Sequence, residues 1–286
     1  MKRLWVLVLV FAGISTLNLM FSQESTYTNR VRSVNQSTLI GIGKAYLFDS
    51  YLSPLTYDGI AISLIHDRLK GSDFFNGALL LQNQYRLQTG VTKNPTSSST
   101  EYWGSLYYNL NGYVPILKQS LNNSNFKLYG GGGPELALGG IYNIRNSNNP
   151  GSLKTHANLN VSAMAIYNWK KLTFRWQVSS PFVGVFFSPE YGHSYYEIFT
   201  LGNDKGTVHF GSFHNQLSLR NYFTIDIPVN NLTIRTGYMW DYYSTDVNML
   251  VTKISVHQFL IGLAFESLNF GYKKARNNQL FKSVYY

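Results

Sequence analysis

The sequence predicts an all-β protein: a single antiparallel transmembrane β-barrel of about 12 strands (roughly 10 to 14) that follows a cleaved signal peptide. Residues 216–227 alternate between a polar face that carries charges and an apolar face, which is the period of a β-strand with two unlike sides. Aromatic residues make up 16% of the chain and charged residues only 13%, whereas charged residues reach about a quarter of a soluble domain. An export signal at the start favours the outer membrane of a Gram-negative cell.

Residues 1–22 are interpreted as a Sec signal peptide. Lys2 and Arg3 precede an apolar run over residues 4–14, and Ser22 offers a small side chain for cleavage. An uncleaved N-terminal anchor is disfavoured because the run is too short to span a membrane stably. The chain has no cysteine, so neither a lipid-bearing cysteine nor a disulfide can form.

The polar, irregular residues 23–36 are predicted to form a periplasmic lead-in, and residues 37–286 to form the barrel. Within the barrel, strand-like segments recur with little helical periodicity. A terminal aromatic residue, here Tyr286, is expected at the end of the last strand. The predicted strands are 38–48, 58–69, 77–90, 101–114, 126–142, 154–168, 172–187, 207–227, 232–244, 250–265, 268–275 and 279–286.

The predicted connections alternate between short turns and long polar loops. Outer-membrane barrels have short periplasmic turns and long outer loops, so an even number of strands is expected, with both termini in the periplasm. The short turns are 169–171, 228–231 and 266–267, and the long loops are 91–100, 143–153 and 188–206.

Lone charged residues on the polar faces of the strands favour a wet lumen over the dry core of a soluble sandwich. A barrel of about twelve strands is narrow, so large polar side chains are expected to fill the lumen, and an open diffusion pore is disfavoured. Arg220 and Asp226 in particular are expected to pair with lumen neighbours. The charged lumen residues are Arg86, Arg175, Arg220, Arg235, Asp226 and Asp241.

The formal charge of the chain is +10. Binding to nucleic acid is a poor explanation for this positive charge in an exported protein. Outer-membrane lipid and lipopolysaccharide are the expected counter-charges. The alternative is that the basic residues are solvated groups of the lumen and rim. The other expected partners are the barrel-insertion machinery and an extracellular glycan or protein.

Three stretches of unusual composition fall in connections that are assigned to the outer side. The first is Asp49-Ser50-Tyr51-Leu52-Ser53-Pro54-Leu55, and the second is Arg145-Asn146-Ser147-Asn148-Asn149-Pro150. The third begins at Phe186 and reads Phe-Phe-Ser-Pro-Glu-Tyr-Gly-His-Ser-Tyr-Tyr-Glu. The second stretch has the composition of a turn, with sugar binding by its amides as the alternative.

These stretches resemble the domain-of-unknown-function 3316 family, a group of secreted, β-rich proteins of Bacteroidetes-type bacteria. The most specific strings are Ser-Pro-Glu-Tyr-Gly-His-Ser-Tyr-Tyr-Glu and Arg-Asn-Ser-Asn-Asn-Pro, and the resemblance covers about residues 37–286. It implies export and an outer-membrane barrel. It implies no activity, because the family has no assigned reaction.

The candidate binding residues lie in the same three stretches. Glu190, His193 and Glu197 suggest a metal or proton-transfer site, but their spacing matches no standard zinc motif. A structured loop held by tyrosine hydroxyls is the preferred interpretation, and neither a metal nor a cofactor is expected. The predicted binding residues are Tyr51, Arg145, Asn146, Asn148, Asn149, Glu190, Tyr191, His193, Tyr195, Tyr196 and Glu197.

The alternative function is an outer-membrane enzyme that hydrolyses or modifies lipid or lipid A, with His214, Ser218 and Asn221 as its candidate catalytic residues. A serine nucleophile needs its base within hydrogen-bond reach, but residues four apart on a strand are separated by about 13 Å. A cross-strand partner such as Ser212 or His257 would be required, and the serine–histidine motifs of such hydrolases are not matched.

His66, His156 and His209 have no carboxylate nearby in the sequence that suggests more than a lumen or girdle position. The favoured function is therefore an integral outer-membrane barrel with a narrow, filled lumen. Its role would be structural, or the binding of a ligand, glycan or partner through the outer loops.

Overall fold

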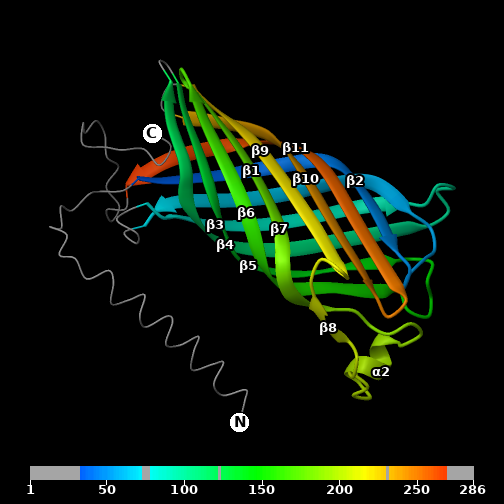
Figure 1. Cartoon of the computed structure of the whole chain (residues 1–286). Coiled ribbons are helices and arrows are strands. Elements are labelled where there is room, and N and C mark those ends of the chain that lie inside the picture. Colours follow the sequence, from blue (N-terminus) through cyan, green and yellow to red (C-terminus); the bar gives the residue numbers. More distant parts are fainter. Residues whose placement is uncertain (1–32, 73–77, 122–123, 230–231, 269–286) are drawn as a thin grey trace, which may run out of the picture. The chain divides into compact units, whose positions relative to one another are not determined.

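The computed structural model describes residues 33–72, 78–121, 124–229 and 232–268 (Figure 1). The predicted signal peptide, the predicted strand at 279–286 and all but the first residue of the predicted strand at 268–275 lie outside these ranges. The described strands are β1 (Ser33–Asp49), β2 (Tyr57–Gly71), β3 (Leu80–Lys93), β4 (Thr100–Leu121), β5 (Ser124–Asn143), β6 (Gly151–Trp169), β7 (Leu172–Phe187), β8 (Val208–Gly211), β9 (Gln216–Val229), β10 (Leu232–Val247) and β11 (Leu250–Leu268).

The strands close into an antiparallel barrel. Each strand of the wall pairs with its neighbours in sequence, and β11 returns to pair with β1 from Ser33 opposite Leu268 to Asp49 opposite Thr252. The described sheet has 11 strands. Short β8 only extends the ladder beside β7, so the closed wall has ten strands.

The prediction of about twelve strands is therefore too high, although ten is the lower limit of the predicted range. Both edges of β1 are already occupied, by β2 and β11. The predicted turn at 266–267 is also wrong, because these residues lie inside β11. β1 begins at Ser33 and so includes the end of the predicted lead-in.

The predicted strand at 207–227 is interrupted at residues 212–215. There the backbone N–H of Asn215 donates to the Ser212 carbonyl at 3.1 Å, and the Asn215 side chain accepts from the Ser212 N–H at 3.0 Å. Serine and asparagine favour such local bonds. The turn separates β8 from β9, although both pair with β7.

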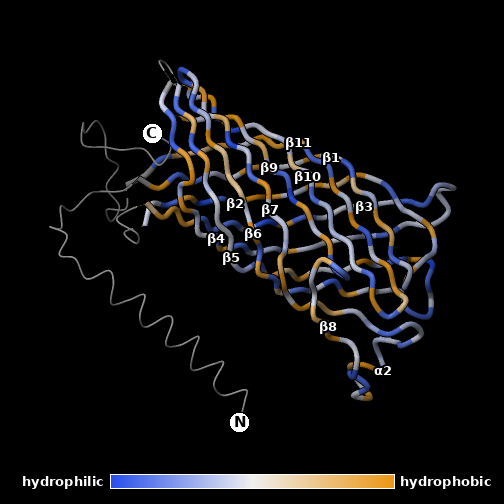
Figure 2. The backbone as a smooth tube through the Cα atoms, viewed as in Figure 1, coloured by the Kyte–Doolittle hydropathy of each residue, from blue (hydrophilic) through white to orange (hydrophobic). Residues whose placement is uncertain are grey.

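The strands have the two unlike faces that the sequence predicts, and Figure 2 shows the alternation of hydrophilic and hydrophobic residues along them. On β9, Gln216, Arg220 and Asp226 are buried in the lumen, whereas Leu217 and Phe223 are exposed on the outside. Buried charges inside and exposed apolar side chains outside are the arrangement of a membrane barrel and the reverse of a soluble protein.

The connections also follow the predicted rhythm. One end of the barrel, here called the turn end, carries connections 72–79, 122–123, 170–171 and 230–231. The other, here called the loop end, carries 50–56, 94–99, 144–150, 188–207 and 248–249. Two connections depart from the rhythm. At the turn end, 72–79 is longer than 50–56, 94–99 or 144–150 at the loop end. At the loop end, Asn248 and Met249 have φ of 55° and 60° and make a tight hairpin.

Side chains fill the lumen along its length. Among the described residues, three buried apolar clusters share it with the charged networks described below. Tyr57 and Trp103 belong to the cluster near the loop end, and Tyr113 and Tyr129 to the cluster near the turn end. α2 (Tyr195–Phe199) is a short helix in the 188–207 connection, beyond the wall (Figure 1). In the described part of the chain, no helix is long and apolar enough to span a membrane.

Candidate functional site at the loop end

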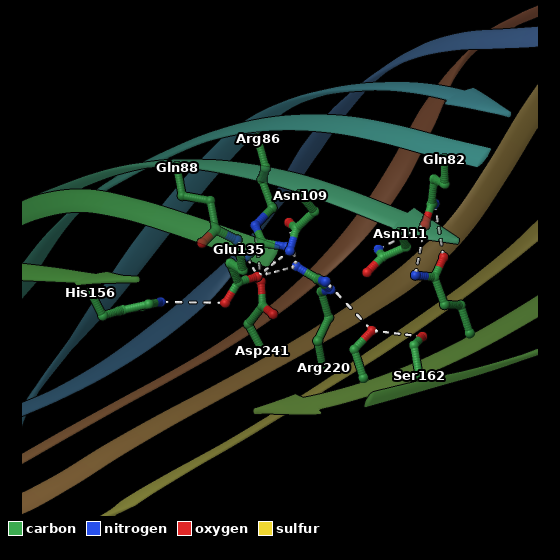
Figure 3. A network of polar contacts seen from close by, with 12 residues as sticks. Gln82, Arg86, Gln88, Asn109, Asn111, Glu135, His156, Ser162, Arg220 and Asp241 are labelled. Atoms are coloured by element: carbon green, nitrogen blue, oxygen red, sulfur yellow. Dashed lines mark hydrogen bonds and ion pairs between the residues drawn. The ribbon is translucent and has the colours of Figure 1, made fainter. Parts of the chain in front are cut away.

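Two charge clusters occupy the lumen below the loop end. The first joins Arg86, Glu135, Arg220 and Asp241 (Figure 3). Arg220 Nη1 lies 3.1 Å from Glu135 Oε2, and Arg86 Nε lies 3.4 Å from Asp241 Oδ2. A cavity of about 20 Å³ remains between them, which is room for roughly one water molecule.

The second cluster joins Asp67, Arg175, Asp226 and Arg235. Arg235 binds Asp226 through two bonds, Nε to Oδ1 at 2.5 Å and Nη2 to Oδ2 at 2.6 Å. Arg175 donates to Asp67, and Arg235 Nη1 also donates to Ser37 Oγ at 2.8 Å. Bidentate arginine–carboxylate pairs are among the strongest hydrogen-bonded contacts, so this cluster ties β1, β2, β7, β9 and β10 together across the lumen.

The two clusters confirm the expectation that Arg220 and Asp226 pair with lumen neighbours: Arg220 with Glu135 of β5, and Asp226 with Arg235 of the adjacent strand β10. His156 lies in the lumen, one of the two positions predicted for it. It has no carboxylate near it in the sequence, yet its Nε2 lies 3.3 Å from Glu135 Oε1 because β5 and β6 are neighbours. The His156 ring also stacks on Tyr243, with centroids 5.1 Å apart.

Closer to the loops, a third set of polar side chains crosses the mouth of the lumen. Lys154 Nζ lies 2.9 Å from Asp49 Oδ2 and donates to Thr252 Oγ1 at 2.8 Å. On the other side, Asn143 Nδ2 donates to the Tyr57 hydroxyl and to Glu101 Oε1, both at 3.0 Å. Connections 50–56 and 144–150 therefore begin at residues that are hydrogen-bonded to other strands of the rim.

The structure brings three of the predicted binding residues together above this rim. The Tyr51 hydroxyl donates to the His193 carbonyl at 2.8 Å, and the Tyr51 ring meets that of Tyr195 edge-on at 5.7 Å. The Tyr195 hydroxyl in turn accepts from the Leu153 N–H at 2.6 Å. Burial raises the pKa of Tyr51 and Tyr195 above the usual value. These tyrosines lock connections 50–56 and 188–207 to each other and to β6.

The asparagine-rich stretch 145–150 forms a turn that is hydrogen-bonded to connection 50–56. Asn146 Nδ2 donates to the Leu52 carbonyl at 3.2 Å, and Asn146 Oδ1 accepts from the Asn149 N–H at 3.0 Å. Arg145 and Asn148 are exposed. Asn146 and Asn149 thus support the loop, and Arg145 and Asn148 face solvent.

The third stretch holds Glu197 in the N-terminal cap of α2. Ser194 and Glu197 form a capping box: Glu197 Oε2 accepts from the Ser194 N–H at 2.7 Å, and Ser194 Oγ accepts from the Glu197 N–H at 3.2 Å. The bond from the Ser194 N–H lowers the pKa of Glu197. His193 Nε2 is 3.9 Å from Glu190 Oε2. Among the described residues, no group of three or more potential ligands could hold a metal ion.

The 188–207 connection also presents apolar side chains to solvent. Tyr191, Tyr196, Phe199 and Leu201 are between 59% and 68% exposed. Phe199 stacks on Tyr195 and on Phe187, with centroids 5.9 Å and 6.0 Å apart. Sequence reasoning named Tyr191 and Tyr196 and missed Phe199 and Leu201, although both follow the third stretch directly.

The residues of the alternative catalytic set lie apart. On β9, Ser218 faces the lumen and Asn221 the outside, because an odd separation places residues on opposite faces of a strand. His214 lies in the turn before β9, where its Nδ1 is 2.5 Å from the exposed Ser212 Oγ. The structure does not unite His214, Ser218 and Asn221.

Comparisons with known proteins give a family and several distant structural likenesses. A family described as "Protein of unknown function (DUF3316)" matches residues 4–274. No curated protein matches the chain. Among solved structures, the outer membrane protease OmpT from Escherichia coli is similar at 9% identity and a TM-score of 0.46, covering 85% of this chain and 99% of that chain.

Two autotransporter domains are also similar. The transport unit of AIDA-I from Escherichia coli has 11% identity and a TM-score of 0.41, covering 91% of this chain and 97% of that one. The translocator domain of NalP from Neisseria meningitidis has 8% identity and a TM-score of 0.35, covering 92% and 97%. Since these TM-scores are low, the fold assignment depends on the strand pairing of this chain itself.

Proposed function

Because the chain belongs to the DUF3316 family of proteins of unknown function, we propose its role from its own structure: an outer-membrane barrel with a closed lumen that binds an extracellular glycan or protein through its loop end. The wall is the outer-membrane type, with buried charges inside and exposed apolar side chains outside. Only closed barrels and helices satisfy their backbone within a bilayer. The short turns are then periplasmic and the loop end external.

The observation that carries the binding role is the fixed arrangement of the loops. Tyr51, Tyr195 and Asn146 join three connections by hydrogen bonds and ring contact. Exposed Tyr191 and Tyr196 are displayed on this frame. A preorganised surface loses little conformational entropy on binding, and aromatic side chains contribute much of the energy of such contacts.

The test is the double variant Tyr191→Ala/Tyr196→Ala, probed with purified lipopolysaccharide and a panel of bacterial surface polysaccharides and proteins. We expect at least a tenfold loss of affinity, about 1.4 kcal/mol, with insertion unchanged. Met249→Ala is the matched control, since Met249 is 84% exposed at the same end but in another connection.

Insertion is followed by the heat-dependent shift of the barrel on a gel. A double variant that no longer inserts would show that these tyrosines are architectural. Affinity equal to that of the wild-type chain, or no binding by the wild-type chain to any probe, would contradict the proposed role.

A further inference from the structure

A serine and a histidine lie side by side on the outer face of β11, away from both the lumen and the loops. Ser255 Oγ is 3.4 Å from His257 Nε2. On the adjacent strand β10, the Tyr238 hydroxyl is 2.6 Å from His257 Nδ1, and Trp240 Nε1 donates to Ser255 Oγ at 3.2 Å. The Trp240 ring stacks on the His257 ring, with centroids 5.8 Å apart and planes at 13°.

The donors and acceptors of this group allow the proton arrangement that a nucleophile requires. Indole nitrogen can only donate, so Ser255 Oγ accepts from Trp240 and its own proton is free to point at His257 Nε2. In that tautomer of His257, Nε2 is the unprotonated nitrogen, and Nδ1 carries the proton and donates to Tyr238. A serine next to a basic nitrogen, with a third group that orients the imidazole, is the general form of an activated nucleophile.

The group lies where the apolar outer wall gives way to charged side chains. Toward the turn end, Phe259 and Ile261 are 73% and 64% exposed. Toward the loop end, Lys253 follows on the same face. In β1, Lys44 is directly opposite His257, which places their Cβ atoms about 5 Å apart.

This boundary is where the ester groups of membrane lipids lie, between acyl chains and headgroups. Aromatic girdles mark the same level in outer-membrane barrels. Tyr46, opposite Ser255 in β1, meets His257 edge-on with centroids 6.4 Å apart, and Lys44 Nζ lies 5.0 Å from the Tyr46 ring centroid. Lys44 also pairs with Asp58 at 2.6 Å. A cation at this level suits a lipid with an anionic headgroup.

We propose that Ser255 and His257 are the nucleophile and general base of a lipid O-acyl hydrolase that acts on acyl esters of anionic lipids in the external leaflet. The proposal rests on the membrane embedding put forward above. It is independent of what the loops bind.

The reaction follows from the arrangement of these atoms. His257 Nε2 takes the Ser255 proton as Oγ attacks the ester carbonyl carbon, and a tetrahedral oxyanion forms within reach of Lys44. The ester C–O bond breaks, and the leaving alkoxide takes the proton from His257. Water, deprotonated by His257, then attacks the acyl-serine carbonyl carbon. The C–Oγ bond breaks, His257 returns the proton to Oγ, and a fatty acid leaves, so that Ser255 and His257 are restored. Tyr238 is a positioning residue, because it acts on the ester only through His257.

The experiment uses the full chain, purified in detergent and shown to be folded by its heat-dependent gel shift. It is incubated with phosphatidylglycerol vesicles in one arm and lipid A vesicles in the other, and released fatty acid is measured by mass spectrometry. The two arms separate glycerophospholipid from lipid A as the source of the ester. We expect release in at least one arm, and at least a 100-fold loss in Ser255→Ala and in His257→Ala.

Ser244→Ala is the matched control, since Ser244 is opposite Lys253 on the same outer face of β10 and should leave the rate unchanged. A fluorophosphonate probe should label the wild-type chain and not Ser255→Ala. Tyr238→Phe should lower the rate of labelling and shift its pH profile, which loss of a structural girdle contact would not do.

Absence of fatty acid and of label with folded wild-type chain would overturn the proposal, as would turnover that survives Ser255→Ala. A chain that is soluble and never shows the heat-dependent shift would instead overturn the membrane embedding. The two failures are therefore distinguishable.

Discussion

Several loop-end residues whose side chains could bind a ligand instead hold the loops in place by hydrogen bonds. Glu197 was a candidate ligand by residue type, but it caps α2 and accepts from the N–H and the hydroxyl of Ser194. The pattern Ser194-Tyr195-Tyr196-Glu197 is the S-x-x-E signature of a capping box, so its role could have been read from the sequence. The contact between Tyr51 and His193 could not, because 142 positions separate them in the chain.

Ser194→Ala should loosen α2 at neutral pH, because the cap is lost. A typical N-cap contributes about 1 kcal/mol, so hydrogen-exchange protection of residues 195–200 should fall about fivefold. The pKa of Glu197 is lowered in the folded loop. Its ionised form therefore stabilises the loop above the unfolded-state pKa, and this stabilisation is lost as the pH falls through the folded-state pKa.

The wild-type chain should consequently approach the variant on acidification. Hydrogen exchange, corrected for the intrinsic effect of pH, measures this convergence. Ser147→Ala, in an exposed position of another connection, should have no effect on α2. Equal protection of wild type and Ser194→Ala at neutral pH would show that the cap contributes nothing.

Among the elements, the pairing of β1 with β11 decides how many strands the wall holds. Period-two alternation predicts the strands themselves well, since 216–227 has the two faces that the structure shows. The alternation cannot give the number of strands in the wall, because that number depends on which strand pairs with β1 to close the barrel. The break at 212–215 was missed although the alternation changes phase across it: Phe210 is exposed at an even position, and Leu217 and Phe223 are exposed at odd positions.

Gly43 shows how closely these two strands approach. A Cβ atom at Gly43 would lie 1.8 Å from the His257 carbonyl oxygen in β11. Gly43→Ala should therefore destabilise the barrel by about 1–3 kcal/mol, the usual cost of overpacking. Urea unfolding in lipid vesicles, followed by tryptophan fluorescence, measures the difference.

Gly151→Ala is the control, because a Cβ at Gly151 has open space around it. If both variants unfold at the same urea concentration as the wild type, the close approach of β1 and β11 at Gly43 is not a constraint.

For the whole molecule, the ten-stranded wall and the crowded lumen have one consequence for transport. Freely conducting porins have about 16 to 18 strands. Here the remaining space at the first charge cluster is about 20 Å³. A narrow lumen was predictable from strand number and side-chain size. The partners within it were not, because Glu135 and Arg220 lie on strands that are not neighbours.

Purified barrel in a planar lipid bilayer should therefore give no resolvable conductance steps. The same preparation, checked for its heat-dependent gel shift, supplies the control for insertion, and a 16-stranded porin supplies the control for detection. Porin-like steps would show that the charge clusters rearrange to open a path.

The balance of the two charge clusters also bears on how related sequences can diverge. Each cluster holds two guanidinium groups and two carboxylates: Arg86, Arg220, Glu135 and Asp241 in one, and Arg175, Arg235, Asp67 and Asp226 in the other. Loss of one member leaves a buried charge without its partner, which costs about 3–5 kcal/mol. Family members should therefore exchange these residues in opposite-charge pairs. Position 235 should then covary with position 226 on the neighbouring strand.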